Sequence, residues 1–180
     1  MILLARHGET DDNRPPLRVQ GSRDTPLNET GRAQAAELAE RVRHERIGTL
    51  YCSPLSRARA TAEVVGAAVG LEPVPDTRFV EADRGRWEGR LFVDLEREEP
   101  ERWAAWQRAG EGFRFPGGES LREQMDRVMA GLGDVRRRGR LPALVVCHGG
   151  SIRAALCHAD PRGLDAFHAW EVPNVALIRP

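Results

Sequence analysis

The sequence predicts an α/β protein, a three-layer α/β/α sandwich with a mostly parallel central sheet. An apolar run, 1–5, leads directly into Arg6-His7-Gly8, and a second apolar run, 144–147, leads into His148-Gly149-Gly150. Between these runs, short extended stretches alternate with helical stretches, which is typical of a parallel sheet. Two parallel strands that each end in His-Gly would bring two imidazoles to the carboxyl edge of the sheet, where such folds bind ligands.

The first quarter of the chain reads as strand, loop, helix and strand. Residues 1–5 form an expected buried strand, and 6–27 an expected loop rich in Arg, Asp, Pro and Gly. Because loops this long inside a compact domain are more often functional than idle, this loop is a candidate part of a site. Asn28 is the expected N-cap of a helix over 29–46. A second strand is expected over 49–52.

A second helix is expected after the turn at Ser53-Pro54. Its apolar spacing continues through Val69, and Gly70 is the expected helix end. Val74 and the pair Phe79-Val80 are expected to be short extended pieces.

The middle of the chain is expected to be irregular. Residues 82–90 form a polar, Gly- and Arg-rich loop, and 91–109 form helical pieces interrupted near Pro100. A Pro-Gly-Gly loop is expected over 113–119.

A longer helix is expected to begin at Ser120, or at Glu119 just before it. One apolar stripe follows at helical spacing and is assigned to the core: Leu121, Met125, Val128, Met129, Leu132 and Val135. The run Arg136-Arg137-Arg138 would be a solvated helix end that suits the macrodipole. After the strand at 144–147, a helix is expected over 151–158 and an edge strand over 175–178.

Length and composition indicate one globular domain, 1–180. The 27 basic and 27 acidic residues cancel, so no nucleic-acid or anionic-membrane partner is expected. No run approaches the roughly 20 apolar residues of a membrane span. No signal peptide is recognised at the start, which favours a cytoplasmic location.

The three cysteines, Cys52, Cys147 and Cys157, are odd in number and lack the spacing of a metal site or a disulfide framework. They are expected to be reduced and mostly buried. Cys147 adjoins His148, but strand neighbours point to opposite faces, so a Cys/His nucleophile pair is not expected.

The residues at the predicted strand ends would suit phosphoester chemistry. Lysine is absent, so a phosphate must be held by guanidinium groups or backbone amides. His7 can be the nucleophile, Arg6 and Arg57 can clamp phosphoryl oxygens, and His148 can donate to them. Nearby guanidinium groups would keep His7 neutral.

Glu81, after Phe79-Val80, can carry the proton of the leaving oxygen. Asn13, Gln20 and the amides near Gly21 can complete an anion cradle. Each of these residues taken singly is more commonly structural, but together, at successive strand ends, they favour a site.

These residues also resemble a known family. Arg6-His7-Gly8-Glu9-Thr10 with Asn13 resembles the signature of the histidine phosphatase superfamily, in its phosphoglycerate mutase-like branch. The resemblance continues in order through five further blocks: Gln20-Gly21 with Thr25-Pro26-Leu27, Gly31 and Gln34-Ala35; Ser53-Pro54-Leu55 with Arg57-Ala58 and Thr61-Ala62; Glu81 with Gly85, Trp87, Glu88 and Gly89; Pro116-Gly117-Gly118-Glu119-Ser120; and His148-Gly149-Gly150 with Ile152-Arg153.

The resemblance implies a metal-independent phosphoric monoester hydrolase that forms a phosphohistidine on His7. Arg6, Arg57 and His148 would bind the phosphoryl group, and Glu81 would be the proton donor and later the base. Two contacts, Asn13 and Gly149, would support the substrate. Asn28 stands where Thr is usual, and both cap helices. Arg84 stands where the family commonly has an aromatic residue.

Two alternatives remain open. Cofactor-dependent phosphoglycerate mutases resemble this chain but carry an added segment before the Pro-Gly-Gly motif, whereas here the stretch from Gly89 to Gly117 is short. A non-catalytic phosphate-binding module is the second alternative, and the complete residue set argues against it. No metal or cofactor is expected, because His7 and His148 lack a partner at ligand spacing. Asp11-Asp12 is interpreted as a solvated loop pair.

The expected partner is a small-molecule phosphomonoester, and the protein is expected to be a monomer or a homodimer. Phosphosugars, phosphoserine, phosphoglycerates and a cobamide-pathway nucleotide phosphate all remain candidates. Arg84, Arg86, Arg90 and Arg114 lie in loops that could face the pocket and favour multiply anionic substrates, or could be solvated. Trp87, Trp103, Trp106 and Phe113 could form a lid or simply pack it.

Overall fold

The computed structural model describes all residues, 1–180, and contains one five-stranded sheet in the order β3-β2-β4-β1-β5. The pairs β1–β4, β4–β2 and β2–β3 are parallel, and β5 pairs antiparallel with β1. The strands are β1 (Ile2–Arg6), β2 (Thr49–Cys52), β3 (Val74–Pro75), β4 (Ala143–Cys147) and β5 (Leu177–Ile178). The predicted mostly parallel sheet is confirmed.

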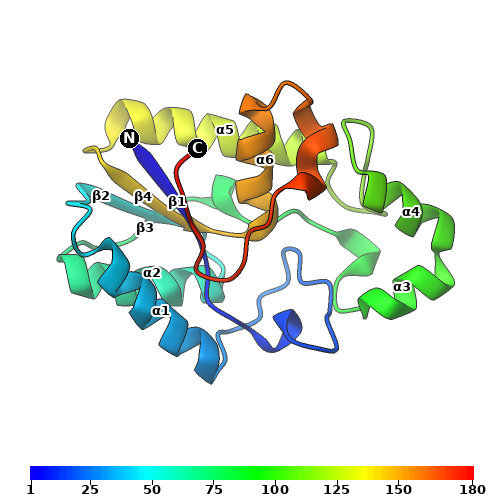
Figure 1. The fold of residues 1–180 in the computed structure, drawn as a ribbon, viewed down its shortest axis with the longest axis horizontal. Coiled ribbons are helices and arrows are strands. Elements are labelled where there is room, and N and C mark those ends of the chain that lie inside the picture. Colours follow the sequence, from blue (N-terminus) through cyan, green and yellow to red (C-terminus); the bar gives the residue numbers. More distant parts are fainter.

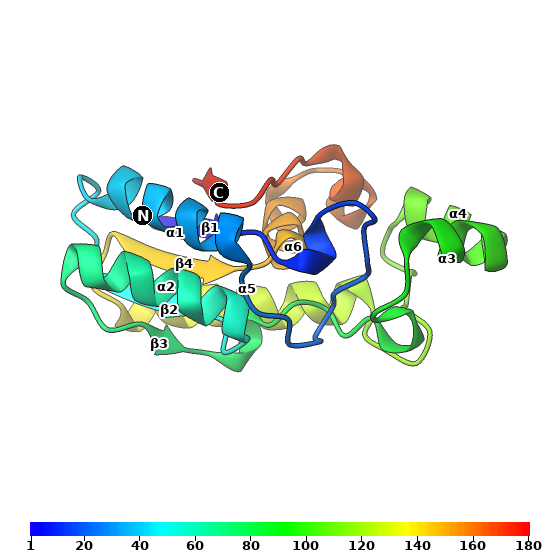
Figure 2. The same cartoon turned by 90° about the horizontal axis from the view of Figure 1, so that it is seen from below.

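Helices cover both faces of this sheet (Figures 1 and 2). One face carries α1 (Glu29–Val42) and α2 (Ser56–Val69), and the other carries α5 (Leu121–Arg138) and α6 (Gly149–Ala159). Successive side chains of each central strand pack alternately against the two helix layers, because strand neighbours point to opposite faces. Leu3 of β1 packs in the α1–α2 core, whereas Leu4 packs in the α5–α6 core. The three-layer sandwich is therefore confirmed.

The predicted helix signals are present in the structure. The Asn28 side chain accepts a hydrogen bond from the Gly31 amide (2.8 Å), which satisfies a donor at the start of α1. Gly70 ends α2 in the left-handed region at φ +73°, where glycine carries no steric penalty. Ser120, not Glu119, is the N-cap of α5, and it forms a capping box with Glu123.

Three boundaries differ from the prediction. Helix α1 ends at Val42 rather than 46, because the chain turns through Arg46 (φ +49°) and brings Ile47 into the core. The final strand has only two residues, since Val175 at φ +52° interrupts extended backbone. Helix α6 begins at Gly149, two residues earlier than expected.

Phe79 ends a short 3-10 helix (Thr77–Phe79) instead of an extended piece. The Asp76 carboxylate accepts a hydrogen bond from the Arg78 amide (2.9 Å). This local contact stabilises a turn in place of a strand, and the pattern of apolar residues does not predict it.

The remaining two helices extend beyond the sandwich, beside the carboxyl edge of the sheet (Figure 2). They are α3 (Phe92–Glu98) and α4 (Pro100–Arg108), and Pro100 occupies the first turn of α4, as the predicted interruption requires. Their inner side joins a core cluster that includes Trp87, Trp106 and Phe115. All four tryptophans of the chain belong to this cluster or pack against it. No helix combines the length and apolar character that crossing a membrane requires.

Candidate active site

Three neighbouring strands end at the edge where the predicted site lies. The sheet order places β2, β4 and β1 side by side, and Ser53, His148 and His7 are the first residues after them. The sheet pairing continues one step further, since the His7 amide donates to the Cys147 carbonyl (3.0 Å). The fold therefore sets three polar side chains in a row at one edge.

A cavity of about 370 Å³ opens at this edge, a size suited to a small metabolite. Its lining includes seven of the nine residues that the sequence predicts for the site: Arg6, His7, Asn13, Gln20, Gly21, Glu81 and Gly149. The other two, Arg57 and His148, are fully buried directly behind His7. Arg57 Nε is 3.3 Å from His7 Nε2, and the two imidazole centroids are 5.1 Å apart. All nine residues are thus brought together.

Hydrogen bonds assign the tautomer of His7. His7 Nδ1 lies 2.7 Å from the Gly8 carbonyl oxygen, which can only accept, so Nδ1 carries the proton. Arg57 Nε donates to Nε2, which must then hold a lone pair. The ring nitrogen with an available lone pair is therefore Nε2, which lies against Arg57, and His7 is one of the residues that line the cavity.

The surroundings of His7 keep it unprotonated. Burial lowers its pKa well below the ordinary value, and His148, Arg57 and Arg6 lower it further, in that order. The predicted effect of the guanidinium groups is present, but desolvation is the larger cause. At neutral pH the imidazole is therefore unprotonated at Nε2.

Arg57 is held in place by backbone carbonyls. Its terminal nitrogens donate to the carbonyls of Arg23 (2.7 Å) and Gly21 (2.8 Å). Burial lowers the pKa of Arg57 to about 10, which still leaves it charged at neutral pH. Gly21 thus contributes a carbonyl that orients Arg57, and the loop 6–27 and helix α2 together position one cation against His7.

His148 presents a donor with no partner. Its Nε2 is 2.8 Å from the Ser53 hydroxyl, whose oxygen also accepts a hydrogen bond from the Leu55 amide (3.3 Å). We assign the hydroxyl proton to the bond with Nε2, which leaves the proton of His148 on Nδ1. Nδ1 is buried without a hydrogen-bond partner. A phosphoryl oxygen bound at His7 would satisfy it.

Glu81 is buried but ionised. Its Oε1 accepts from the Ala82 amide (2.9 Å) and Gln124 Nε2 (2.7 Å), and its Oε2 accepts from the Gly150 amide (2.8 Å). Burial raises the pKa of Glu81, but the charge of Arg84 and these hydrogen bonds outweigh burial and lower it below its usual value. In the free protein Glu81 is therefore a base, and it needs a proton before it can act as an acid.

Helix α6 directs its first turn at this site. A Cβ on Gly150 would lie 2.3 Å from Glu81 Oε1, which is a clash. Only glycine at this position lets the carboxylate come so close to the helix N-terminus. Gly149 lines the cavity, and its amide lies at the positive end of the helix dipole. The Arg6 guanidinium donates to the Val172 carbonyl (2.7 Å), and its Nε has no partner.

The two predicted amides contact each other at the cavity wall. Asn13 Nδ2 donates to Gln20 Oε1 (3.3 Å), and Gln20 Nε2 donates to the Thr10 hydroxyl (2.6 Å). Asn174, from the C-terminal segment, donates to the His7 carbonyl (3.0 Å). Contact of Asn13 or Gln20 with a substrate stays a prediction.

Sequence reasoning assigned no role to two residues that orient the site. Ser53 contacts His148, and its position directly after a predicted strand could have indicated a role in the site. Gln124 contacts Glu81 and is fully buried, and its signal was a polar side chain within the apolar stripe of α5. Such a side chain inside a core face needs a buried partner.

Several interpretations of charged residues need correction or resolution. Asp12 is not solvated; it is buried and accepts a hydrogen bond from the Thr25 hydroxyl (2.7 Å), while Asp11 is exposed. Of the four loop arginines considered for the pocket, Arg84, Arg86, Arg90 and Arg114, only Arg84 lines the cavity. Arg90 pairs with Glu98 and Glu99, Arg114 pairs with Glu123, and Arg86 is exposed.

The Cys147 thiol takes no part in the site. It packs in the core between the sheet and the α5–α6 layer, and burial raises its pKa to about 12. Because the thiolate is the reactive form, this cysteine is not a nucleophile at neutral pH. The expected separation of Cys147 from His148 is confirmed.

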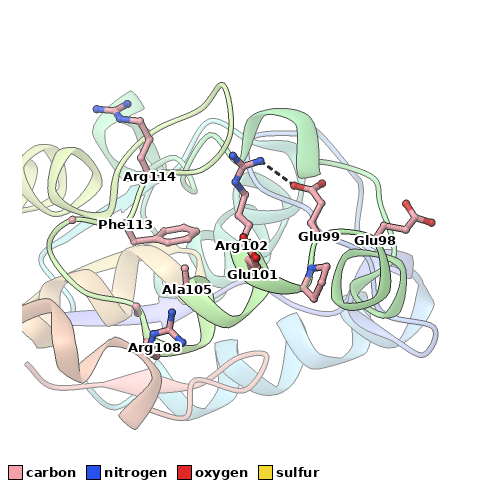
Figure 3. A pocket seen from close by; sticks show the side chains of 11 residues that line it. Glu98, Glu99, Glu101, Arg102, Ala105, Arg108, Phe113 and Arg114 are labelled. Atoms are coloured by element: carbon pink, nitrogen blue, oxygen red, sulfur yellow. Dashed lines mark hydrogen bonds and ion pairs between the residues drawn. The ribbon is translucent and has the colours of Figure 1, made fainter.

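A larger hollow than this cavity lies elsewhere on the molecule. A groove of about 940 Å³ runs along α4 and the loop after it, with both charge signs along its walls (Figure 3). Glu99 and Arg102 point toward each other there and pair at 3.1 Å. The groove contains no imidazole and no thiol, so we place the chemistry in the smaller cavity. No three His, Cys, Asp or Glu side chains are grouped as a metal site.

Comparisons with known proteins agree with this geometry. Residues 2–179 match the family described as the histidine phosphatase superfamily (branch 1). Phosphoserine phosphatase 1 of Hydrogenobacter thermophilus is 36% identical over 176 residues, which cover 97% of this chain and 83% of that protein. The probable phosphoglycerate mutase GpmB of Salmonella choleraesuis is 39% identical over 151 residues, which cover 82% and 69%.

Solved structures share the fold. A structure titled Mycobacterial hydrolase 1 superposes with a TM-score of 0.88 at 29% identity and covers 98% of this chain and 86% of its own. Mycobacterial glucosyl-3-phosphoglycerate phosphatase, in complex with VO3, superposes with a TM-score of 0.87 at 29% identity and covers 98% and 90%. Family match, fold and the paired imidazoles at the sheet edge agree, and the chain belongs to branch 1 of the histidine phosphatase superfamily.

Proposed function

We propose that this protein is a metal-independent phosphomonoesterase that hydrolyses a small phosphorylated metabolite through a phosphohistidine on His7. The observation that carries the proposal is the neutral His7, whose unprotonated Nε2 lies beside Arg57 and at the cavity. The relatives named as phosphatases of small phosphometabolites support the reaction class.

In the first step the lone pair of His7 Nε2 forms a bond to phosphorus. The ester P–O bond breaks, and its electron pair leaves with the substrate oxygen, which takes a proton from Glu81. Arg57 Nε transfers its hydrogen bond from Nε2 to a phosphoryl oxygen, and Arg6 and His148 Nδ1 donate to the others. These cations and donors stabilise the charge of the transferring group.

Glu81 obtains its proton from the substrate or from its surroundings. A phosphate monoester has its second pKa near 6, so it brings a proton in its monoanionic form. Negative charge placed beside Glu81 also raises the pKa of that carboxyl. In the second step the Glu81 carboxylate accepts a proton from water, which attacks phosphorus. The P–N bond breaks and inorganic phosphate leaves.

Trapping the intermediate tests this proposal. Brief reaction with a 32P-labelled ester, followed by alkaline quench, is expected to leave label on His7, since a phosphoramidate survives base and is lost in acid. His7→Ala is expected to bind no label and to lose several orders of magnitude in turnover while keeping its circular dichroism spectrum. His44→Ala, at an exposed imidazole, is the matched control. Undiminished turnover of His7→Ala would refute the nucleophile.

A chelator tests the absence of a metal. We expect dialysis against EDTA to leave turnover unchanged, because guanidinium and imidazole groups already provide the positive charge and the acid–base groups. Loss of turnover that Mg²⁺ or Zn²⁺ restores would contradict the metal-free mechanism.

A mutase is the second candidate, because GpmB relatives carry that description. A mutase returns the phosphoryl group to a bound acceptor, whereas a phosphatase releases it to water. Following 3-phosphoglycerate by 31P NMR separates the two: we expect inorganic phosphate to appear, without accumulation of 2-phosphoglycerate.

The three unpaired, buried cysteines support the proposed cytoplasmic location.

A further inference from the structure

We propose that the cavity contains a second anion subsite, formed by Arg84 and Arg153, that takes a carboxylate of the substrate next to its phosphoester. The inference rests on the proposed function and names its substrate class: phosphomonoesters of small carboxylic acids. Both arginines line the cavity together with the phosphoryl-binding residues, and neither belongs to the set assigned to the phosphoryl group.

The two guanidinium groups are positioned but unpaired. The Arg84 guanidinium lies against both Trp106 and Phe115, with its Cζ 5.4 Å and 5.2 Å from the ring centroids. Arg153 lies 5.8 Å from the centroid of Phe167 and donates its Nε to the Trp170 carbonyl (2.9 Å). The aromatic faces and this one carbonyl fix the orientation of both groups and leave their terminal nitrogens for a ligand.

Neither arginine has a close carboxylate. The only ion pair of Arg84 is a 4.0 Å contact with Glu81, although its side chain is only 11% exposed, and its buried Nε has no hydrogen-bond partner. The outer arginines behave differently: Arg78 pairs with two aspartates, and Arg127 contacts both oxygens of Glu119. Buried cations without a partner are costly, so a ligand anion is the expected partner.

Positive charge exceeds negative charge around the cavity. Arg6, Arg57, Arg84 and Arg153 all lie near the single carboxylate of Glu81, while Arg18 and Asp12 add one charge of each sign to the lining. A bound phosphoryl dianion leaves positive charge over whether Glu81 is ionised or protonated, and a further anionic group of the substrate would reduce it. A planar carboxylate also matches the forked donors of guanidinium.

The position of the subsite sets the length of the substrate. A terminal nitrogen of Arg84 lies 4.0 Å from Glu81 Oε2, and both arginines line the cavity beside Arg6 and His7, so the subsite adjoins the phosphoryl site directly. A carboxylate there must lie only a few bonds from the ester oxygen, as in a three-carbon phosphorylated acid.

Matched substrate pairs test the subsite. In 3-phosphoglycerate and glycerol 3-phosphate, a carboxylate is exchanged for a hydroxymethyl group, and phosphoserine and phosphoethanolamine differ by the carboxylate alone. We expect kcat/KM for the acid to exceed that for its partner by roughly 10- to 100-fold, the range of a charged hydrogen-bonded pair. Arg84→Gln and Arg153→Gln should each reduce this ratio about 10-fold.

The ratio separates substrate recognition from positioning of Glu81. If Arg84 acted only by positioning Glu81, its substitution would lower kcat/KM for both substrates of a pair by the same factor. The ratio of the two kcat/KM values would then stay unchanged. Arg84→Lys, which keeps the charge, should restore part of the ratio, and Arg86→Gln, at an exposed arginine of the same loop, should leave it unchanged.

Three results would overturn the subsite: equal kcat/KM for both members of each pair in the unmodified protein, an unchanged ratio in both Gln variants, or a stronger preference for fructose 1,6-bisphosphate over fructose 6-phosphate than for acids. Hydrolysis of p-nitrophenyl phosphate keeps these outcomes distinct from failure of the proposed function. If that ester is hydrolysed through labelled His7 but no acid is preferred, only the subsite is wrong. If no ester is hydrolysed, the proposed function itself is wrong.

Discussion

At the scale of single residues, the site depends on where the protons lie in the free protein. The bond to the Gly8 carbonyl places the proton of His7 on Nδ1, and with the Ser53 hydroxyl assigned as donor to Nε2 the proton of His148 is also on Nδ1. Glu81, which is the proton donor in the proposed mechanism, is ionised in the free protein. The first chemical step therefore requires one proton to arrive with the substrate or in response to its charge.

Substitution of Glu81 should affect substrates according to their leaving groups. An alkyl ester leaves as a strongly basic alkoxide unless it is protonated, whereas p-nitrophenolate leaves unaided. Glu81→Gln should therefore slow the first turnover of an alkyl ester by ~10²–10⁴-fold and that of p-nitrophenyl phosphate far less. Rapid-quench measurement of both esters checks this, with the exposed Glu171→Gln as control. Equal losses on the two esters would show that Glu81 is not the proton donor.

The residues of the candidate site could be predicted as a set, but their contacts could not. The chemistry of His, Arg and Glu indicated five of the nine residues, an expected anion cradle added Asn13, Gln20 and Gly21, and the family resemblance added Gly149. The tautomers depend on Gly8 and Ser53. The ionisation of Glu81 depends on Arg84 and on hydrogen bonds from the Gly150 amide and Gln124, both of which are distant in sequence. No local pattern shows that the carbonyl of Gly21 orients Arg57.

At the scale of elements, the site is assembled from loops that are tied to one another. Glu88 accepts hydrogen bonds at Oε1 from the Ser22 amide (2.7 Å), the Ser22 hydroxyl (2.9 Å) and the Arg84 amide (3.0 Å). It thereby joins the loop 6–27, which holds Arg57, to the loop 82–90, which follows Glu81. Glu88 does not line the catalytic cavity, so its role is to position these loops.

Variants of Glu88 separate positioning from proton transfer. Glu88→Ala should lower kcat/KM by roughly 10- to 100-fold, because small misplacements of catalytic groups have effects of that order. Glu88→Gln keeps an acceptor oxygen and should retain most activity on alkyl esters. If Gln proves as damaging as Ala, and only for esters with poor leaving groups, Glu88 acts as an acid and the positioning role is wrong.

Elements with strong periodicity or caps were predictable, and those formed by local or tertiary contacts were not. The Asn28, Gly70 and Ser120 signals mark real helix ends. The turn at Thr77–Phe79 depends on one side chain, Asp76, and the early end of α1 depends on burying Ile47. Apolar spacing carries no information on either.

At the scale of the whole molecule, two buried neutral imidazoles make stability depend on pH. Burial lowers the pKa of both His7 and His148 well below 6.5, first by desolvation and then through neighbouring cations. The unfolded chain binds protons at these residues near pH 6.5, and the folded protein does not. Below that pH the unfolded state therefore holds more protons, and stability falls as pH falls.

Urea unfolding at pH 7.0 and 5.5 should show this loss. We expect the free energy of unfolding to drop by about 1 kcal/mol for each of the two imidazoles, in addition to the contribution of carboxylates. His148→Gln should flatten the dependence, and His44→Gln, at an exposed histidine, should not. A free energy of unfolding that does not change between the two pH values would contradict neutral, buried imidazoles.

The packing around α3 and α4 has a consequence for how the protein can be observed. All four tryptophans lie in or against the aromatic cluster beside the cavity, whereas the single tyrosine, Tyr51, lies on β2. Intrinsic emission excited at 295 nm therefore originates almost entirely from this side of the molecule. Trp103 and Trp106 line the cavity itself, so ligand binding should alter that emission directly. The molecule thus contains its own optical reporter, and association rates can be followed by stopped flow without an attached dye.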